Sequence, residues 1–127
     1  MRKLSLTGDE PTPVDLVHVT VDHPGAGITV LTVSGEVDMS TAPLVRDTAL
    51  TELASATLVV LDLNRVEFFG SPGLNVLLEL RQRAIEIGVE LRVVASTRAV
   101  TRPLVIAEIT SVFHLHDHLQ DALATLV

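Results

Sequence analysis

The early part of the chain alternates between apolar and polar residues. Over Leu16–Val21 every second residue is valine, which is typical of a strand with one buried face. Ile28–Val33 is similarly apolar, and the segment between them, His23–Gly27, is rich in turn-forming residues. The pattern predicts an antiparallel β-hairpin.

Beyond the hairpin, short apolar runs alternate with longer stretches of helical periodicity. Strands are predicted over Leu58–Leu63, Leu91–Ala95 and Phe113–Leu115. Helices are predicted from Ser40 or Thr41 to Leu53, then over Ser71–Ile87, Ala99–Ala107 and Asp117–Leu126. This alternation predicts a single α/β domain with a mixed sheet of about five strands and about four helices. The strands after the hairpin are expected to be parallel.

The first 13 residues combine charges, a glycine and two prolines. Such a segment lacks the apolar content to pack against a domain. We therefore expect a flexible N-terminal tail over residues 1–13 and a domain over residues 14–127.

The predicted helix over Ser71–Ile87 carries two apolar stripes. At about 100° per residue, one face gathers Leu74, Leu77, Leu78 and Ile85, and we expect this face to join the core. The second stripe contains Val76, Leu80 and Ile87. Either a neighbouring helix covers this stripe, or its first turn is exposed for a partner.

The start of this helix is the most informative stretch of the chain. Ser71 follows a buried strand and a tight turn, and Pro72 follows Ser71. A serine oxygen can accept a hydrogen bond from an unpaired N–H at a helix start, and proline suits the first helical position. We therefore predict Ser71 as the N-cap, at a positive helix terminus where α/β folds place ligands. On this local chemistry alone, Ser71 could be only a cap.

Two sequence blocks resemble the signatures of the STAS family, the anti-sigma-factor antagonists. One runs from Leu61-Asp62-Leu63 through Val66-Glu67-Phe68-Phe69-Gly70-Ser71-Pro72-Gly73-Leu74. The other is Gly35-Glu36-Val37-Asp38-Met39-Ser40-Thr41-Ala42-Pro43-Leu44-Val45-Arg46, in the same order as in the family. The resemblance extends over roughly residues 14–127.

The resemblance implies a partner-switching protein that binds an anti-sigma factor with an ATP-dependent serine kinase fold. That kinase would phosphorylate Ser71 and end the binding, and a phosphatase would restore it. The implied partner-binding residues are Asp38, Ser40, Thr41, Gly70, Ser71, Pro72, Gly73, Leu74, Asn75 and Val76. For Asp38, local capping and turn formation is an equally open role.

The chain departs from the family at two positions beside Ser71. Many members have an acidic residue before the phosphorylated serine and a second serine after it, where this chain has Gly70 and Pro72. The first change removes a carboxylate that could engage a kinase basic group or Mg²⁺, and the second leaves one hydroxyl to modify. Gly73 is retained, and without a Cβ it permits close approach of another backbone.

Composition excludes several function classes. The chain has 127 residues, 47% of them hydrophobic, no cysteine and a net charge of −7. Without cysteine there are no disulfides, thiol catalysts or cysteine metal sites, and a cytoplasmic protein is expected. The negative charge and the lack of Tyr and Trp argue against a nucleic-acid partner. We also see no uncharged apolar run long enough to span a membrane and no signal peptide.

We expect neither a metal, a cofactor nor an enzymatic activity. The run His114-Leu115-His116-Asp117-His118 is one residue shorter than a metallohydrolase ligand run, and no further ligands accompany it. No phosphate loop, dinucleotide fingerprint or nucleophile elbow is present. Two other functions are alternatives: an interaction module of a larger complex without a switch at Ser71, and a nucleotide-binding or hydrolytic α/β protein.

Overall fold

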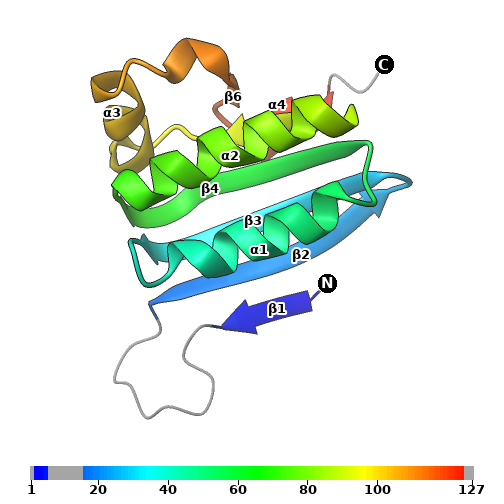
Figure 1. Cartoon of the computed structure of the whole chain (residues 1–127), viewed down its shortest axis with the longest axis horizontal. Coiled ribbons are helices and arrows are strands. Elements are labelled where there is room, and N and C mark those ends of the chain that lie inside the picture. Colours follow the sequence, from blue (N-terminus) through cyan, green and yellow to red (C-terminus); the bar gives the residue numbers. More distant parts are fainter. Residues whose placement is uncertain (1, 6–15, 125–127) are drawn as a thin grey trace.

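The protein is an α/β domain built on one mixed sheet (Figure 1). The computed structural model describes residues 2–5 and 16–124. The strands are β1 (Arg2–Ser5), β2 (Val17–Gly25), β3 (Ile28–Val37), β4 (Leu58–Phe69), β5 (Glu90–Val94) and β6 (His114–His116). The helices are α1 (Ala42–Leu53), α2 (Ser71–Ile87), α3 (Arg98–Ile106) and α4 (Leu119–Ala124), with a 3₁₀ turn at Thr110–Val112. The α/β class and the hairpin are thereby confirmed.

The six strands lie in the sheet in the order in which they occur in the chain. β1, β2 and β3 pair antiparallel, whereas β3 to β6 pair parallel. The sheet has one strand more than the expected number of about five, because Arg2–Ser5 pairs with β2 and is not part of a tail. This segment is too short to show a strand period in the sequence. The rest of the predicted tail, residues 1 and 6–13, lies outside the described residues.

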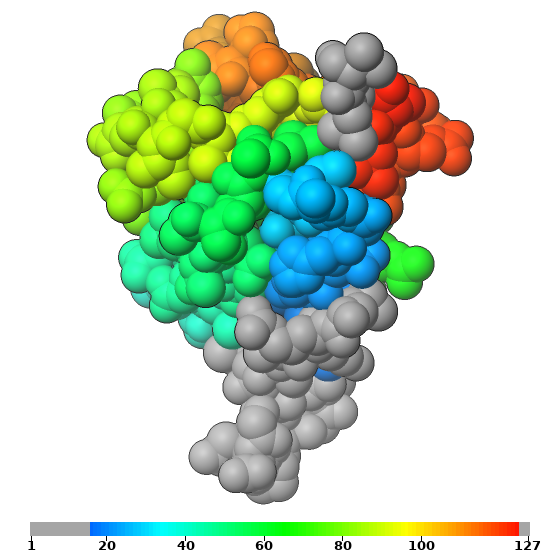
Figure 2. All heavy atoms as spheres, turned by 90° about the vertical axis from the view of Figure 1, so that its right-hand side faces the viewer, coloured from blue at the N-terminus to red at the C-terminus, as the bar shows by residue number. Residues whose placement is uncertain are grey.

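The sequential strand order places three helices on the same face of the sheet. From β3 to β6, each connection leads to the next strand on the same side of the previous one. Such parallel crossovers are almost always right-handed, which puts their helices on one face. α1, α2 and α3 therefore cover one face, and α4 packs on the other. Figure 2 looks onto the hairpin end of the sheet, where β2 and β3 (blue) separate α1 and α2 on one side from α4 (red) on the other.

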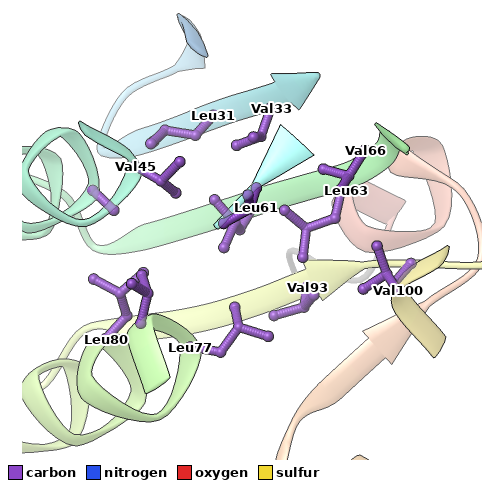
Figure 3. Close-up of a cluster of buried hydrophobic side chains, with 14 of the residues drawn as sticks. Leu31, Val33, Val45, Leu61, Leu63, Val66, Leu77, Leu80, Val93 and Val100 are labelled. Carbon is purple, nitrogen blue, oxygen red and sulfur yellow. The ribbon is translucent and has the colours of Figure 1, made fainter. Parts of the chain in front are cut away.

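The main core lies between the sheet and the first three helices. In Figure 3, Val45 of α1 and Leu77 and Leu80 of α2 point towards Leu61 of β4. A smaller cluster on the opposite face consists of Val30, Leu58, Val60, Val94 and Ala122. β4 is buried on both faces as a result, which accounts for its unbroken apolar run.

β4 is much longer than the sequence predicted. The predicted strand ended at Leu63, but β4 continues to Phe69 and pairs with β3 as far as Val37. The register between the two strands shifts twice, between Asp62 and Arg65 and between Val66 and Phe68. At both points β4 has one extra residue, as in a β-bulge. The polar pair Asn64-Arg65 therefore bulges the strand and does not end it.

The two apolar stripes of α2 are used differently from the prediction. Val76, Leu77 and Leu80 are buried, whereas Leu78 and Ile85 of the predicted core face are exposed. α1 packs beside α2 and covers the Val76 stripe. The interpretation with a neighbouring helix therefore holds for Val76 and Leu80, whereas Ile87 of the same stripe is exposed. An exposed first turn for a partner stays a prediction.

We predict that Gly35→Ala destabilises the domain. Gly35 lies inside β3 with φ of +97°, and a Cβ there would come within 2.4 Å of the Leu16 carbonyl oxygen. A left-handed conformation costs a residue with a side chain about 1–3 kcal/mol, and the overlap adds to this cost. Urea unfolding should show a loss of about 2 kcal/mol or more.

Gly88→Ala is the matched control for this substitution. Its φ of +73° is also positive, but a Cβ there meets nothing within 4 Å. A loss for Gly35→Ala no larger than that for Gly88→Ala would contradict the proposed overlap.

Candidate functional site

The two signature blocks meet at one edge of the sheet. β3 and β4 are parallel and end together, and α1 and α2 both begin at that edge (Figure 1). The Gly70 N–H donates to the Val37 carbonyl at 3.0 Å. This bond joins the turn that starts at Asp38 to the turn that carries Ser71.

Ser71 is the first residue of α2 and not its N-cap. The cap is Gly70, whose carbonyl accepts from the N–H groups of Gly73 at 2.9 Å and Leu74 at 3.3 Å. Gly70 is extended, with φ of −88° and ψ of −178°, and its own N–H is held by Val37. The prediction is wrong by one residue, because this bond keeps Gly70 outside the helix. The Ser71 side chain is exposed and does not cap the helix.

The start of α2 offers an anion fewer N–H groups than most helix starts do. Pro72 has no N–H, and those of Gly73 and Leu74 are both directed to the Gly70 carbonyl. The helix macrodipole still favours negative charge at this end. A phosphate on Ser71 would therefore gain from the macrodipole more than from direct backbone hydrogen bonds.

Asp38 organises the turn before α1. Its Oδ1 accepts from the Ser40 hydroxyl at 2.8 Å and from the N–H groups of Ser40 at 2.9 Å and Thr41 at 3.1 Å. The Ser40 hydroxyl in the first place, and these N–H groups with it, lower the pKa of Asp38 below its usual value. The local turn-forming role that the sequence left open for Asp38 is confirmed.

Thr41 acts from inside the domain. Its hydroxyl accepts from the Asp38 N–H at 2.8 Å and donates to the Glu36 carbonyl at 2.7 Å. The side chain is fully buried, so it fixes the turn and cannot touch a partner.

Gly73 allows a side chain, and not another backbone, to approach. A Cβ on Gly73 would lie 2.7 Å from the Phe69 ring. Phe69 is buried and lies beneath the first turn of α2. The absence of a side chain at position 73 therefore lets the helix start pack onto the end of β4.

The predicted partner-binding residues divide into three groups by burial. Ser40, Ser71 and Asn75 are exposed, and Asp38, Gly70, Pro72 and Leu74 are partly exposed. Thr41, Gly73 and Val76 are buried. The last three support the exposed residues from beneath, and Val76 also lines the groove between the starts of α1 and α2. Partner binding by this set stays a prediction.

Comparisons with known proteins match most of the chain. The STAS domain model matches residues 19–122. The chain is 37% identical over 112 residues to a Mycobacterium tuberculosis protein named anti-sigma-F factor antagonist RsfB, covering 86% of this chain and 88% of that protein.

The chain belongs to the STAS domain family.

Solved structures show the same fold. An anti-sigma factor antagonist from Mycobacterium paratuberculosis superposes with a TM-score of 0.78 at 33% identity, covering 87% of this chain and 93% of that one. The phosphorylated Bacillus cell fate determinant SpoIIAA superposes with a TM-score of 0.68, covering 86% and 99% of the two chains. At 12% identity, this second likeness concerns the fold alone.

Sequence reasoning missed two exposed apolar residues beside Ser71 in this STAS domain. Met39 is 82% exposed and Phe68 is 53% exposed. Met39 and Pro72 help to line a shallow groove of about 230 Å³ between the first turns of α1 and α2. The signal for Phe68 was the pair Phe68-Phe69 on a strand, since neighbouring strand residues face opposite ways and only one of them joins the helix-covered core.

The histidine run of this STAS domain lies on and just after the edge strand β6, and the expected lack of metal binding stays a prediction. His114 and His116 lie on the edge strand β6, and the nearest carboxylate to His114 is Glu90 at 3.9 Å. Residues 2–5 and 16–124 contain no cluster of three or more potential His, Asp or Glu ligands. Within the same residues, every helix is too short or too polar to cross a bilayer.

We predict that Asp38→Ala loosens the turn before α1. The substitution removes the acceptor for two N–H groups and a hydroxyl, and the loss of such a cap costs about 1 kcal/mol. Asp38→Asn keeps an oxygen acceptor without the charge and should lose less. Urea unfolding of the three proteins at neutral pH provides the comparison.

The same variants test the pH dependence. The pKa of Asp38 is lower in the folded than in the unfolded state. The ionised carboxylate therefore stabilises the fold above its unfolded pKa of about 3.9, and this stabilisation is lost as pH falls through the pKa of the folded state. The stability gap between wild type and Asp38→Asn should therefore narrow below about pH 4. A gap that stays constant from neutral pH to pH 3 would argue against a charged Asp38 in the turn.

Proposed function

We propose that this STAS domain is an anti-sigma-factor antagonist that is switched at Ser71. Unphosphorylated, it binds an anti-sigma factor with an ATP-dependent serine kinase fold and so releases the sigma factor for transcription. Phosphorylation of Ser71 by that kinase ends the binding, and a phosphatase restores it. The contact surface consists of the Ser71 turn, the first turn of α2 and the neighbouring Asp38 turn.

One observation carries the proposal. The Ser71 hydroxyl is exposed and takes no part in capping its helix, so its modification does not require the domain to unfold. The relative at 37% identity is named an anti-sigma-F factor antagonist, and this name supports the partner class. The Asp38 turn lies beside the serine, joined to it through the bond from Gly70 to Val37.

The proposed switch must act at the interface. A hundredfold loss of affinity corresponds to about 2.7 kcal/mol. The macrodipole of α2 cannot provide it, because it contributes about 0.3–2 kcal/mol and favours an anion at the helix start. A phosphate with about −1.5 to −2 charges opposes binding when it must lose its water against the partner. The protein keeps its fold and loses its partner.

The remaining features fit a protein that acts by binding. The net charge of −7 disfavours direct contact with DNA, so transcription would be regulated through the anti-sigma factor. The proposal includes no metal, cofactor, membrane or enzymatic activity of its own. It also places the protein in the cytoplasm, where sigma factors work.

A second candidate is an interaction module without a switch. Gly70 supplies no carboxylate beside Ser71 to engage a kinase, and Pro72 stiffens the turn. In that case, binding to the partner would be insensitive to the state of Ser71. The two predictions below separate the candidates.

We predict that the cognate kinase-fold anti-sigma factor phosphorylates Ser71 and no other residue stoichiometrically. Ser71 is exposed at the start of α2, where the macrodipole favours a phosphate. Mass spectrometry after incubation with the kinase and ATP should find one phosphate per chain, and none for Ser71→Ala. Ser40→Ala is the matched control, because Ser40 is an exposed serine on the neighbouring turn. Phosphorylation of Ser71→Ala at the wild-type rate would refute the assignment.

We predict that Ser71→Glu weakens binding to the anti-sigma factor and that Ser71→Ala does not. Glutamate has less charge than phosphate and a different shape, so we expect a partial loss of about tenfold, or 1.4 kcal/mol. Isothermal titration of the purified pair measures both affinities, and circular dichroism checks that the variants are folded. Equal affinities for wild type and a folded Ser71→Glu would favour the unswitched module.

A further inference from the structure

Phe68 is an aromatic residue at the surface of a chain that has few aromatic residues. The chain contains three Phe and no Tyr or Trp. Phe69 and Phe113 are buried, whereas Phe68 is 53% exposed. A half-exposed aromatic ring at an established interface is often an energetic anchor, because it loses a large apolar area to water-free contact on binding.

The ring lies directly against the turn that carries Ser71. A Cβ built on Gly70 would be 3.1 Å from Cε2 of Phe68 and 3.4 Å from its Cζ. The edge of the ring therefore occupies the space into which a side chain at position 70 would project. At this turn the surface presents an aromatic edge next to the serine.

A second apolar side chain accompanies Phe68 on this edge of the molecule. Met39 is the most exposed large apolar residue in the described part of the chain, at 82%. It lines the groove that Pro72 also lines, between the starts of α1 and α2. Pro72 also lies close to Gly70 on the side of the Phe68 ring. Met39, Pro72 and Phe68 thus surround the turn with apolar groups.

Two glutamates are neighbours of Phe68 in the backbone of the sheet. Glu36 of β3 pairs directly with Phe68 across the two strands, and Glu67 precedes it. Both glutamates are exposed. A partner that binds at this surface therefore needs an apolar pocket for the Phe68 ring and positive charge to compensate the two glutamates.

We propose that Phe68, assisted by Met39, is the apolar anchor of the partner interface. It inserts into a pocket of the anti-sigma factor that is apolar at its base and carries Lys or Arg at its rim, next to Glu36 and Glu67. This inference rests on the proposed function and adds to it the chemistry of the partner surface. Gly70 contributes by leaving room for the ring, so the contact at this turn is apolar and not acidic.

The test compares Phe68→Ala and Met39→Ala with Ile85→Ala in titrations with the purified anti-sigma factor. Ile85 is a matched control, because it is 59% exposed and lies 14 positions after Ser71 on α2, about 21 Å along the helix. We expect Phe68→Ala to weaken binding at least tenfold, Met39→Ala about threefold and Ile85→Ala not measurably. Phe68→Leu should restore part of the affinity.

The charges beside the ring and the residue at position 70 give two further readouts. Glu36→Gln with Glu67→Gln should slow association and reduce its dependence on salt, as expected for carboxylates that face a basic rim. Gly70→Asp should weaken binding in wild type, because it displaces the ring, and change it much less in Phe68→Ala. Circular dichroism checks that each of these variants is folded.

The outcomes separate this inference from the function on which it rests. If wild type binds the anti-sigma factor and a folded Phe68→Ala binds equally well, the anchor is refuted and the proposed function stands. If wild type itself does not bind, both proposals are wrong. An equal loss in Phe68→Ala and Ile85→Ala would also refute the anchor, because it would show that any exposed apolar residue has the same effect.

Discussion

The parallel pairing of β3 with β4 is the constraint on which the candidate site depends. It continues to Val37 and Phe69 and ends with the bond from the Gly70 N–H to the Val37 carbonyl. Because both strands stop at the same edge, α1 and α2 start side by side. The Asp38 turn and Ser71 are 33 positions apart in the chain, yet they share one surface. The two bulges in β4 each take up one extra residue, so that the strand stays paired with β3 up to this point.

Buried residues hold the site in place from beneath its surface. Thr41 holds the Asp38 turn from within the domain through its hydroxyl. Phe69 packs under the first turn of α2, because Gly73 has no side chain that would overlap the ring. Buried residues of this kind place the exposed ones without contacting anything outside the protein. The division explains how one short segment can contain both Phe69, which belongs to the core, and Phe68, which does not.

The fold class could be predicted because apolar runs and turn residues report directly on strands and helices. Details that depend on neighbours could not. The sequence alone could not show that α1 packs beside α2 and covers Val76. The sequence also could not show that β4 continues through Asn64-Arg65, because a β-bulge interrupts the alternation by which a strand is predicted. The sequence identified Ser71 as the functional candidate but predicted it as the N-cap, whereas it is the first helical residue. The N-cap is Gly70, because the hydrogen bond from its N–H to the Val37 carbonyl keeps it outside the helix. The exposure of Met39 follows from tertiary packing, which no local pattern contains. For Phe68 the pair Phe68-Phe69 was a local signal, but only tertiary packing decides which of the two is exposed.

The strand order also bears on how the chain reaches this structure. Each strand pairs with the strand that precedes it in the chain, from β1 to β6. Each new strand adds to the outside of the sheet already formed, and none is inserted between two earlier strands. Each parallel connection spans about 20 residues, and the entropic cost of closing a loop rises only slowly with its length. Such a sheet can be laid down one strand at a time as the polypeptide leaves the ribosome. The Ser71 surface is complete once α2 has formed, before β5 and β6 are added to the edge.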